Sequence, residues 1–351
     1  MYIIISILIF GLIIVVHEFG HFIAAKLFKV GVPEFAVGMG PKLFKKQGRE
    51  TLYTLRAIPI GGFCALDGDD DEEQGESSLF AKPLWQRFLI FFAGAFLNVV
   101  AGFLILLALT STAATLPTLT LSGFAEGFEL EGPEALMVGD TFHSIDGMRV
   151  YQHNNVGLLL DIAADDTVDI VVVRDGRRVT LTDLPLERRV FDGFDTPRFG
   201  FYFATNEAPT VFDRIAHAYR DTRDFMRQLP LTFRMFASGH AGLGDVSSVV
   251  GIVDIMNQAG TTADTIGIAA QRMAILTAII SISVGMMNLL PVPGLDGGRI
   301  FLMLVTAGIE KITRRKVNPK YEGYINTAGL LLLFGFMIFV VFSDIIRIAT
   351  R

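Results

Sequence analysis

The segment Val16-His17-Glu18-Phe19-Gly20-His21 contains an H-E-x-x-H motif and lies inside the first hydrophobic stretch of the chain. No charged residue occurs from Tyr2 to Val16, so this stretch is predicted to be a membrane-spanning helix. Positions i and i+4 share one helix face, which lets His17 and His21 direct imidazole nitrogens at one metal ion. Glu18 stands where zinc hydrolases of this spacing place a carboxylate that polarises water without ligating the metal.

The motif has a plain alternative, because short matches of this kind also arise by chance in helices. Within an apolar span, however, two His and one Glu cost several kcal/mol unless a metal, a partner or trapped water compensates. The stretch also lacks the basic start and the small-residue cleavage site of a signal peptide, so it is expected to be retained as a helix. The apolar setting therefore favours a metal site.

The composition of the chain indicates a membrane protein. Its 351 residues are 51% hydrophobic with a mean hydropathy of +0.49, which is too apolar for an ordinary soluble protein. Four stretches are long enough to cross roughly 30 Å of hydrocarbon. They are Tyr2 to Ala25, Phe88 to Thr112, Met273 to Leu295 and Ile325 to Phe342. A net charge of −6 argues against a general nucleic-acid role, and the single Cys64 excludes an intrachain disulfide framework.

The distribution of positive charge predicts the orientation of the spans. Lys and Arg residues cluster in residues 26–56, after the first span, and in residues 311–320, before the last. The positive-inside rule places both connections in the cytoplasm, so the chain ends and the region from Ala113 to Asp264 are expected outside. His21 precedes Lys26 by five residues, which puts the motif on the order of 8 Å inside the cytoplasmic end of its helix.

The connection between the first two spans shows a strand pattern. Leu52, Thr54 and Arg56 alternate in a run bounded by Gly and Pro, and Ile58-Pro59-Ile60-Gly61-Gly62-Phe63 follows. This pattern predicts short β-strands in a hairpin-like element. The element is either a plain cytoplasmic loop or an exposed strand that holds an extended substrate by edge pairing. The acidic run from Asp67 to Glu73 is expected to be a solvated loop.

A separate domain is predicted between Gly123 and Asn206. Gly139 to Gly147 match G-D-x(4)-I-D-G, Val168 to Arg174 alternate as a strand does, and Asp175-Gly176 is typical of a hairpin turn. The order of these signals indicates strand, helix, strand, hairpin, strand. It resembles a PDZ domain of the bacterial protease type, and the alternative is a small mixed α/β domain of no particular role.

Two further segments precede the third span. Apolar residues recur at helical spacing from Val211 to Leu229, which predicts an amphipathic helix against the outer membrane surface or against the PDZ-like domain. Residues from Ser238 to Gly251 are rich in Gly and Ser and are expected to form a loop, with a re-entrant course as the alternative.

A third metal ligand is expected near the end of the third span, because a catalytic zinc normally takes three protein ligands and a water. The stretch from Asn288 to Arg299 reads N-L-L-P-V-P-G-L-D-G-G-R, and its prolines and glycines cannot continue a regular helix. This span runs from outside to inside in the predicted topology, so Asp296 reaches a depth comparable to that of His17 and His21. The alternative makes Asp296 a helix cap with Gly297-Gly298 as a turn.

These motifs together resemble the site-2 protease family of intramembrane zinc metalloproteases, in its bacterial regulator-of-sigma-factor protease group. The resemblance covers nearly the whole chain and includes G-A-F-L-N at Gly94 to Asn98. It implies a mainly α-helical membrane protein with four transmembrane helices around a zinc site, a membrane-associated β-hairpin element and an inserted α/β PDZ domain. The expected domains are residues 1–112 with two spans, 113–206 as the PDZ domain, 207–264 as the surface helix and loop, and 265–351 with the last two spans.

The resemblance implies hydrolysis of peptide bonds within or near transmembrane segments of single-span proteins, such as anti-sigma factors or signal-peptide remnants. Zn²⁺ would be held by His17, His21 and Asp296, with Glu18 as the general base. Asn288 and Pro291 would bind the substrate, although Asn288 could equally hydrogen-bond its own broken helix. Expected partners are the lipid bilayer and transmembrane substrates already cut by another protease, with no nucleic acid.

The expected location is the inner (plasma) membrane, with the active site toward the cytoplasm and the PDZ domain outside as a size filter. The chain departs from the family pattern at Ala95, where proline is common, and at Ser248-Val249, which replaces Gly-Pro. It also has room for one PDZ domain where many relatives carry two. The competing function is a proteolytically silent PDZ membrane scaffold, which the intact pair of motifs disfavours.

Overall fold

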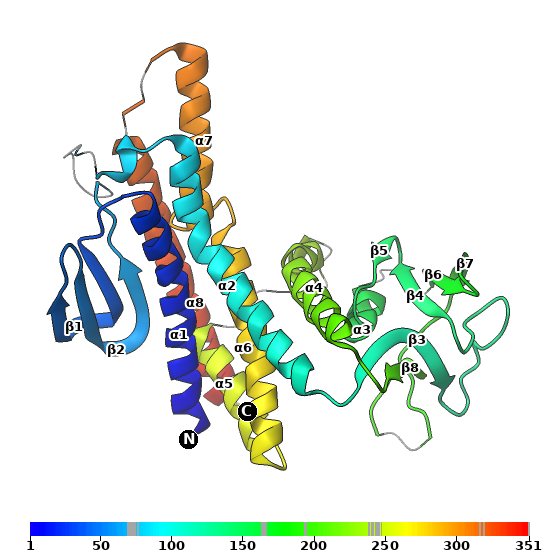
Figure 1. Cartoon of the computed structure of the whole chain (residues 1–351). Coiled ribbons are helices and arrows are strands. Elements are labelled where there is room, and N and C mark those ends of the chain that lie inside the picture. Colours follow the sequence, from blue (N-terminus) through cyan, green and yellow to red (C-terminus); the bar gives the residue numbers. More distant parts are fainter. Residues whose placement is uncertain are drawn as a thin grey trace. The chain divides into compact units, whose positions relative to one another are not determined.

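The computed structural model of the chain (Figure 1) describes residues 1–68, 75, 77–162, 167–192, 195–237, 239, 242, 246, 248–315, 317–318 and 320–349. Most of the predicted acidic loop, from residue 69 onward, lies outside these described residues. The chain divides into two compact units. One comprises Met1–Ile105 and Gly242–Arg351, and the other comprises Leu106–Ala241.

Four helices of the described residues are long and apolar enough to cross a membrane, as the sequence predicts. Their apolar portions are Tyr2–Leu27, Leu84–Thr112, Ile266–Asn288 and Tyr321–Ile346. They belong to helices α1 (Tyr2–Leu27), α2 (Leu84–Thr112), α6 (Ile266–Asn288) and α8 (Lys320–Ala349). The protein is therefore a multi-pass membrane protein, and its short 3-10 turn η1 (Leu79–Ala81) leads into α2.

Two helices of the first unit were not expected. Helix α5 (Val249–Thr261) begins inside the predicted Gly- and Ser-rich loop, so the expectation of a loop up to Gly251 is wrong at its end. The side-chain oxygen of Ser248 accepts hydrogen bonds from the backbone N–H groups of Val250 and Gly251, which satisfies two donors at the helix start. Helix α7 (Asp296–Thr313) fills most of what was expected to be a short connection between the last two spans.

Helix α5 is packed into the bundle of the first unit against α1, α6 and α8 (Figure 1). Its Met256 joins Ile13, Met273 and Ile280 in a buried apolar cluster. The Asp344 carboxylate of α8 accepts two hydrogen bonds of 2.6 Å from the backbone N–H and the hydroxyl of Ser248. The start of α5 is therefore tied to the end of α8 by a buried polar contact.

Strands β1 (Glu34–Gln47) and β2 (Leu52–Cys64) form a bent two-stranded sheet beside α1 (Figure 1). The start of β2 lies between the two halves of β1: residues 34–37 run parallel to it, and residues 42–47 run antiparallel to it. The end of β2, residues 62–64, pairs antiparallel with residues 35–37. The predicted hairpin-like element is thus present, but each strand is far longer than expected and folds back on its partner.

The end of β2 runs along the first span. A Cβ atom added at Gly11 of α1 would lie 2.4 Å from the Pro59 carbonyl oxygen, so the two backbones are in direct contact there. Further along α1, the backbone N–H of Cys64 donates to the carboxylate of Glu18 at 3.0 Å. The sheet therefore carries its last residues to the H-E-x-x-H motif.

The second unit is built on a sheet in the order β7-β6-β4-β3-β8, with β5 paired to β4. The strands are β3 (Leu116–Phe124), β4 (Thr141–Ile145), β5 (Met148–Arg149), β6 (Val168–Arg174), β7 (Arg177–Leu184) and β8 (Phe201–Asn206). Helix α3 (Asn154–Ile162) packs its apolar residues into the same core as Phe142 and Ile170. The order of elements agrees with the predicted pattern, and assignment to the PDZ class stays a prediction.

Helix α4 (Val211–Ala237) covers the predicted amphipathic segment and continues past Pro230. Its buried side packs against the sheet domain of its own unit, where Asn155 donates to Asp224 at 2.8 Å and Gln152 donates to the carbonyl of His217 at 3.2 Å. Phe212 and Tyr219 are exposed on the helix. Contact with the domain, one of the two predicted alternatives, is thus present.

Candidate metal centre and active-site cavity

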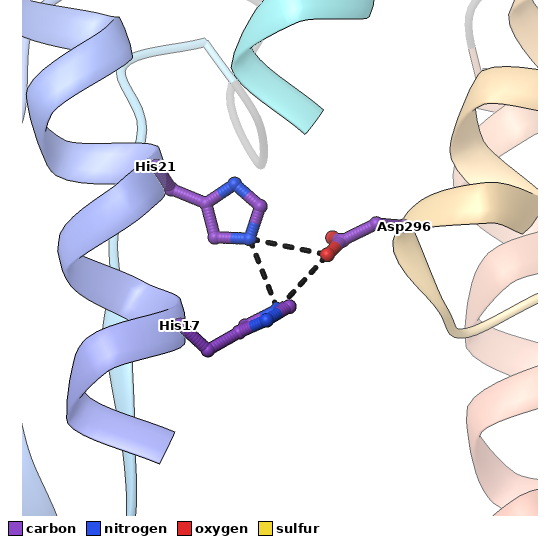
Figure 2. A group of neighbouring side chains, drawn as sticks. All are labelled: His17, His21 and Asp296. Atoms are coloured by element: carbon purple, nitrogen blue, oxygen red, sulfur yellow. Dashed lines mark hydrogen bonds and ion pairs between the residues drawn. The ribbon is translucent and has the colours of Figure 1, made fainter. Parts of the chain in front are cut away.

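The imidazoles of His17 and His21 meet the carboxylate of Asp296 at one point of the first unit (Figure 2). Oδ2 of Asp296 lies 3.0 Å from Nε2 of His17 and 3.1 Å from Nε2 of His21, and the two imidazole nitrogens are 3.2 Å apart. Both histidines are buried, at 7% and 6% exposure. Residues separated by 275 or more positions in the sequence therefore form one compact group, as the sequence predicts.

The orientation of His21 is fixed by the main chain of α2. Nδ1 of His21 lies 2.8 Å from the carbonyl oxygen of Ile90, and a carbonyl can only accept, so Nδ1 carries the proton. In a neutral ring this leaves the lone pair on Nε2, which faces His17 and Asp296. Metal-ligating histidines commonly donate their other N–H to such an acceptor, which fixes the tautomer and the ring plane.

Two glycines provide the space that the histidine pair needs. A Cβ added at Gly94 of α2 would lie 2.4 Å from Nε2 of His21 and 2.9 Å from Cε1 of His17. A Cβ added at Gly20 of α1 would lie 2.4 Å from the carbonyl oxygen of Ala93. The helices α1 and α2 therefore approach backbone to backbone at the motif, and no side chain larger than hydrogen fits at either position without displacement.

Asp296 is presented by a folded loop between α6 and α7. The loop holds itself with backbone hydrogen bonds, from Val292 N–H to the Leu290 carbonyl at 2.7 Å and from Leu295 N–H to the Val292 carbonyl at 3.1 Å. Asp296 is the first residue of α7, so its backbone both ends the loop and starts the helix. The broken backbone predicted here is present, and a new helix follows it directly.

The next two residues let the first turn of α7 lie on the loop. A Cβ added at Gly297 would meet the Leu289 carbonyl at 2.3 Å, and one added at Gly298 would meet the Val292 carbonyl oxygen at 2.1 Å. The turn that the alternative reading placed at Gly297-Gly298 is therefore absent, and the two glycines have a packing role inside a helix. The position of the Asp296 carboxylate depends on this close packing.

Glu18 lies beside the group without joining it. Its carboxylate accepts the hydrogen bond from Cys64 N–H, so the end of β2 holds it in place. It lines a cavity of about 490 Å³ together with His17, His21 and Asp296. This arrangement leaves a carboxylate free of the His and Asp group but next to it, which suits a proton acceptor better than a ligand.

The cavity reaches both α6 and the loop. Asn288, a predicted substrate-binding residue, lines it, whereas Pro291 is exposed and is not among the described lining residues. Sequence reasoning did not single out Phe63 and Arg299, which also line the cavity. Arg299 stands three residues after Asp296, one helical turn away on α7, and that spacing was a signal that could have placed it there.

The residues fit a bound zinc ion by two observations of the site. Zinc ligands at about 2.0 to 2.1 Å in a tetrahedron lie about 3.3 to 3.4 Å from one another, close to the distances found here. In addition, Nε2 of His21 faces a carboxylate oxygen, and in the neutral ring the two lone pairs that meet there are both available to a bound cation. Two imidazoles and a carboxylate form a donor set typical of catalytic zinc, with one position open for water.

The four apolar spans, with two buried histidines and a half-buried Asp296 that could hold a metal, fit the class of membrane-embedded metalloproteases. The chain belongs to the site-2 protease family, since residues 5–336 match the family described as Peptidase family M50. It is 35% identical to "Putative zinc metalloprotease CPE1693" of Clostridium perfringens over 99% of both chains. It is 32% identical to "Putative zinc metalloprotease FN1322" of Fusobacterium nucleatum over 97% of both.

A further relative carries a more specific name. The chain is 25% identical to "Regulator of sigma-W protease RasP" of Bacillus subtilis over 97% of both chains. These matches cover almost the full length of each relative. The family and the names of the relatives together establish that the protein is a zinc metalloprotease of membranes.

Proposed function

We propose that the protein hydrolyses peptide bonds within or near the transmembrane segments of single-span membrane proteins. Zinc is held by His17, His21 and Asp296, and Glu18 acts as the general base. The observation that carries this proposal is the meeting of the three ligand atoms inside an apolar helix bundle, with Glu18 in the same cavity. A protease for soluble substrates has no need to place its ligands on a membrane-spanning helix.

The chemistry divides between the metal and the chain. Bound zinc supplies Lewis acidity, which lowers the pKa of water toward about 7 and polarises a peptide carbonyl. Glu18 accepts the proton of the attacking water and then transfers it to the leaving amine. The N–H of Cys64 holds one oxygen of Glu18 at 3.0 Å, which leaves the other oxygen to accept the proton.

A substrate helix must unwind before attack, because its peptide groups are shielded and internally hydrogen-bonded. The end of β2 supports this step. Residues 62–64 pair with β1 on one side only, and no other described strand covers their outer edge. An unwound segment can pair along that edge in an extended form. Asn288, in the cavity wall, would hold the main chain of the substrate. Pro291, exposed on the loop and outside the described lining, would contact the substrate there.

The remaining parts of the chain limit access. We assign the sheet domain, residues 113–206, as an extracytoplasmic PDZ domain that admits substrates already trimmed by another protease. The membrane is the inner (plasma) membrane, with the metal centre toward the cytoplasm, as the Lys and Arg clusters favour. The name of the Bacillus relative concerns regulation of a sigma factor, which supports anti-sigma factors as substrates, with signal-peptide remnants as the second class.

The test is cleavage of a purified single-span substrate in detergent by wild-type protein and by Glu18→Gln. The variant should lose cleavage by at least roughly 100-fold, because general acid–base catalysis contributes about 10²- to 10⁴-fold, and it should keep its zinc. Asp296→Asn is the matched variant, since it should lower the zinc content measured by metal analysis. Chelator-treated wild-type protein gives the metal-free baseline.

Cleavage by Glu18→Gln at the wild-type rate would show that the base is misassigned. Unchanged zinc content in Asp296→Asn would remove this residue from the ligand set. A soluble form of the substrate, lacking its span, tests the membrane specificity, and equal cleavage of both forms would contradict it. Cleavage that persists in the chelated protein would exclude the zinc mechanism altogether.

A further inference from the structure

Helix α8 is the most weakly buried of the four spans. In its most apolar 18-residue stretch only 11% is buried, whereas the corresponding stretches of α2, α1 and α6 are 39%, 28% and 28% buried. Its large apolar residues from Leu330 to Phe342 are mostly exposed. General burial of apolar surface therefore gives little account of why α8 lies where it does. Specific contacts hold it instead, and one of them is the buried contact of Asp344 with Ser248.

Helix α8 makes a second close contact, with the loop that leads to Asp296. A Cβ added at Gly329 of α8 would lie 2.3 Å from the carbonyl oxygen of Pro293, and one added at Gly294 would lie 2.8 Å from the backbone nitrogen of Leu330. One helical turn earlier, Oδ1 of Asn326 accepts a hydrogen bond from Gly294 N–H at 3.4 Å. The helix and the loop thus touch backbone to backbone.

Two other glycines of the same helix have no such role. A Cβ added at Gly323 or at Gly335 would have no neighbouring atom within 4 Å among the described residues. Gly323 lies nearly two turns before Gly329, and Gly335 lies nearly two turns after it. The absence of a side chain is therefore required for packing at Gly329 alone among these three positions.

The loop connects this contact with α8 directly to Asp296. Gly294 stands two residues before Asp296, and Leu295 between them donates back to the Val292 carbonyl. On its other side the loop is pressed against the first turn of α7, where Gly297 and Gly298 leave no free space. The loop is enclosed between two helices, so a displacement of Pro293 and Gly294 moves the Asp296 carboxylate with them.

We propose that Asn326 and Gly329 of α8 are positioning residues that set the Asp296 carboxylate at its distance from His17 and His21. This inference rests on the proposed function of Asp296 as a zinc ligand. Neither residue lines the cavity, and both act through the loop. Contacts that orient metal ligands commonly cost about 10- to 100-fold in metal affinity when they are removed.

The experiment measures the zinc affinity of purified full-length protein in detergent, by competition with a chromophoric chelator. Gly329→Ala should weaken zinc binding by about 10- to 100-fold. Asn326→Ala, which removes one long hydrogen bond, should weaken it by roughly 3- to 10-fold. Gly323→Ala and Gly335→Ala are the matched controls: they make the same change in the same helix, and their affinity should equal that of the wild type.

Thermal unfolding of the metal-free proteins separates positioning from general damage. Alanine is a better helix former than glycine at all three positions. In Gly329→Ala this gain offsets part of the cost of displacing the loop, so the metal-free variant should still unfold cooperatively, and it should lose the extra stability that zinc gives. A zinc affinity equal to that of the two controls would overturn the proposal.

Two further variants make the result unambiguous. If Gly329→Ala does not fold, Asn326→Ala alone decides, and an unchanged affinity in that variant overturns the proposal. Asp296→Asn is measured in parallel, because it tests the proposed function by itself. Normal zinc affinity in Asp296→Asn contradicts the ligand assignment, whereas weak affinity there and wild-type affinity in Gly329→Ala contradicts only the role of α8.

Discussion

The surroundings of the metal centre and the sheet domain of the second unit are packed by different means. Around His17 and His21, helices approach each other at glycines, and added Cβ atoms at Gly20, Gly94 and Gly297 would lie 2.3 to 2.4 Å from existing atoms. In the sheet domain, large apolar side chains fill the interior, and Phe142 is 2% exposed. A Cβ added at several glycines of that domain, Gly132 among them, would have no neighbouring atom within 4 Å among the described residues.

The two regions are therefore sensitive to opposite kinds of substitution. A site built on backbone contact is sensitive to an added methyl group, because the neighbouring main chain cannot retreat without moving a ligand. A core built on large side chains is sensitive to a lost group, because a cavity remains where atoms were removed. Substitutions of each kind, placed in each region, therefore separate metal binding from folding.

The largest effect is expected at Gly94. Gly94→Ala places a methyl group 2.4 Å from Nε2 of His21, so the imidazole pair must separate. We expect loss of zinc and a fall in peptidase activity of at least roughly 100-fold, measured by metal analysis and by cleavage of a single-span substrate. Gly132→Ala, in open space within the sheet domain, is the control and should change neither. Full zinc content in Gly94→Ala would contradict the claim that the metal centre is sensitive to an added methyl group.

A smaller effect, of the opposite kind, is expected at Phe142. Phe142→Ala removes a buried ring from the sheet domain and should destabilise that domain by about 3 to 5 kcal/mol. Amide hydrogen exchange in β4 and β6 should become faster, while the zinc content should stay at the wild-type level. Val138→Ala, at a position 55% exposed, is the control. Loss of zinc in Phe142→Ala would show that the two regions are not separable in this way.

The smallest effect concerns the β1–β2 sheet beside the site. Burial raises the pKa of Glu34, but hydrogen bonds from Arg56, Thr54 and Lys42 outweigh it and lower the pKa from 4.5 to about 2. Because the folded pKa lies below the unfolded one, the stabilisation is present above about pH 4.5. It is lost as the pH falls through 2.

Glu34→Gln tests this pH dependence. At pH 6 the free energy of unfolding of the variant should be lower than that of the wild type by less than about 1 kcal/mol, since the ion pairs are partly solvated. Its unfolding temperature should be slightly lower as well. The difference should shrink as the pH is lowered from 5 toward 2.5, and zinc-free protein should be used so that metal loss does not intervene. A difference that stays constant with pH would assign the effect to packing instead of charge.

Much of the site could be predicted because the positions of its residues follow from short-range spacing in the sequence. His17 and His21 share a helix face by their separation alone, and Asp296 follows a stretch whose prolines forbid a helix. The pairing of Glu18 with the N–H of Cys64 could not be predicted. It depends on the register of two long strands. Its donor is a backbone N–H, which nearly every residue has, so the sequence does not indicate which one is used.

The unexpected helices have a similar explanation. The Gly- and Ser-rich composition before α5 predicted a loop, but Ser248 acts as a helix cap instead, and tertiary packing against α1 and α6 stabilises the short helix that follows. The alternative reading of Gly297 and Gly298 was a turn at the start of α7, yet they serve close packing within a helix. Glycine marks several structural needs, and composition does not say which one applies.

The hydrogen bond between His21 and the carbonyl of Ile90 has a consequence for mutational tolerance. The acceptor belongs to the peptide unit and not to a side chain, so any amino acid at position 90 supplies the same oxygen. Drift at that residue can alter how tightly the first two spans pack, but it cannot delete the contact that sets the protonation pattern of the ring. A carboxylate side chain in the same role would be lost by a single codon change at its position, whereas every residue type keeps this carbonyl.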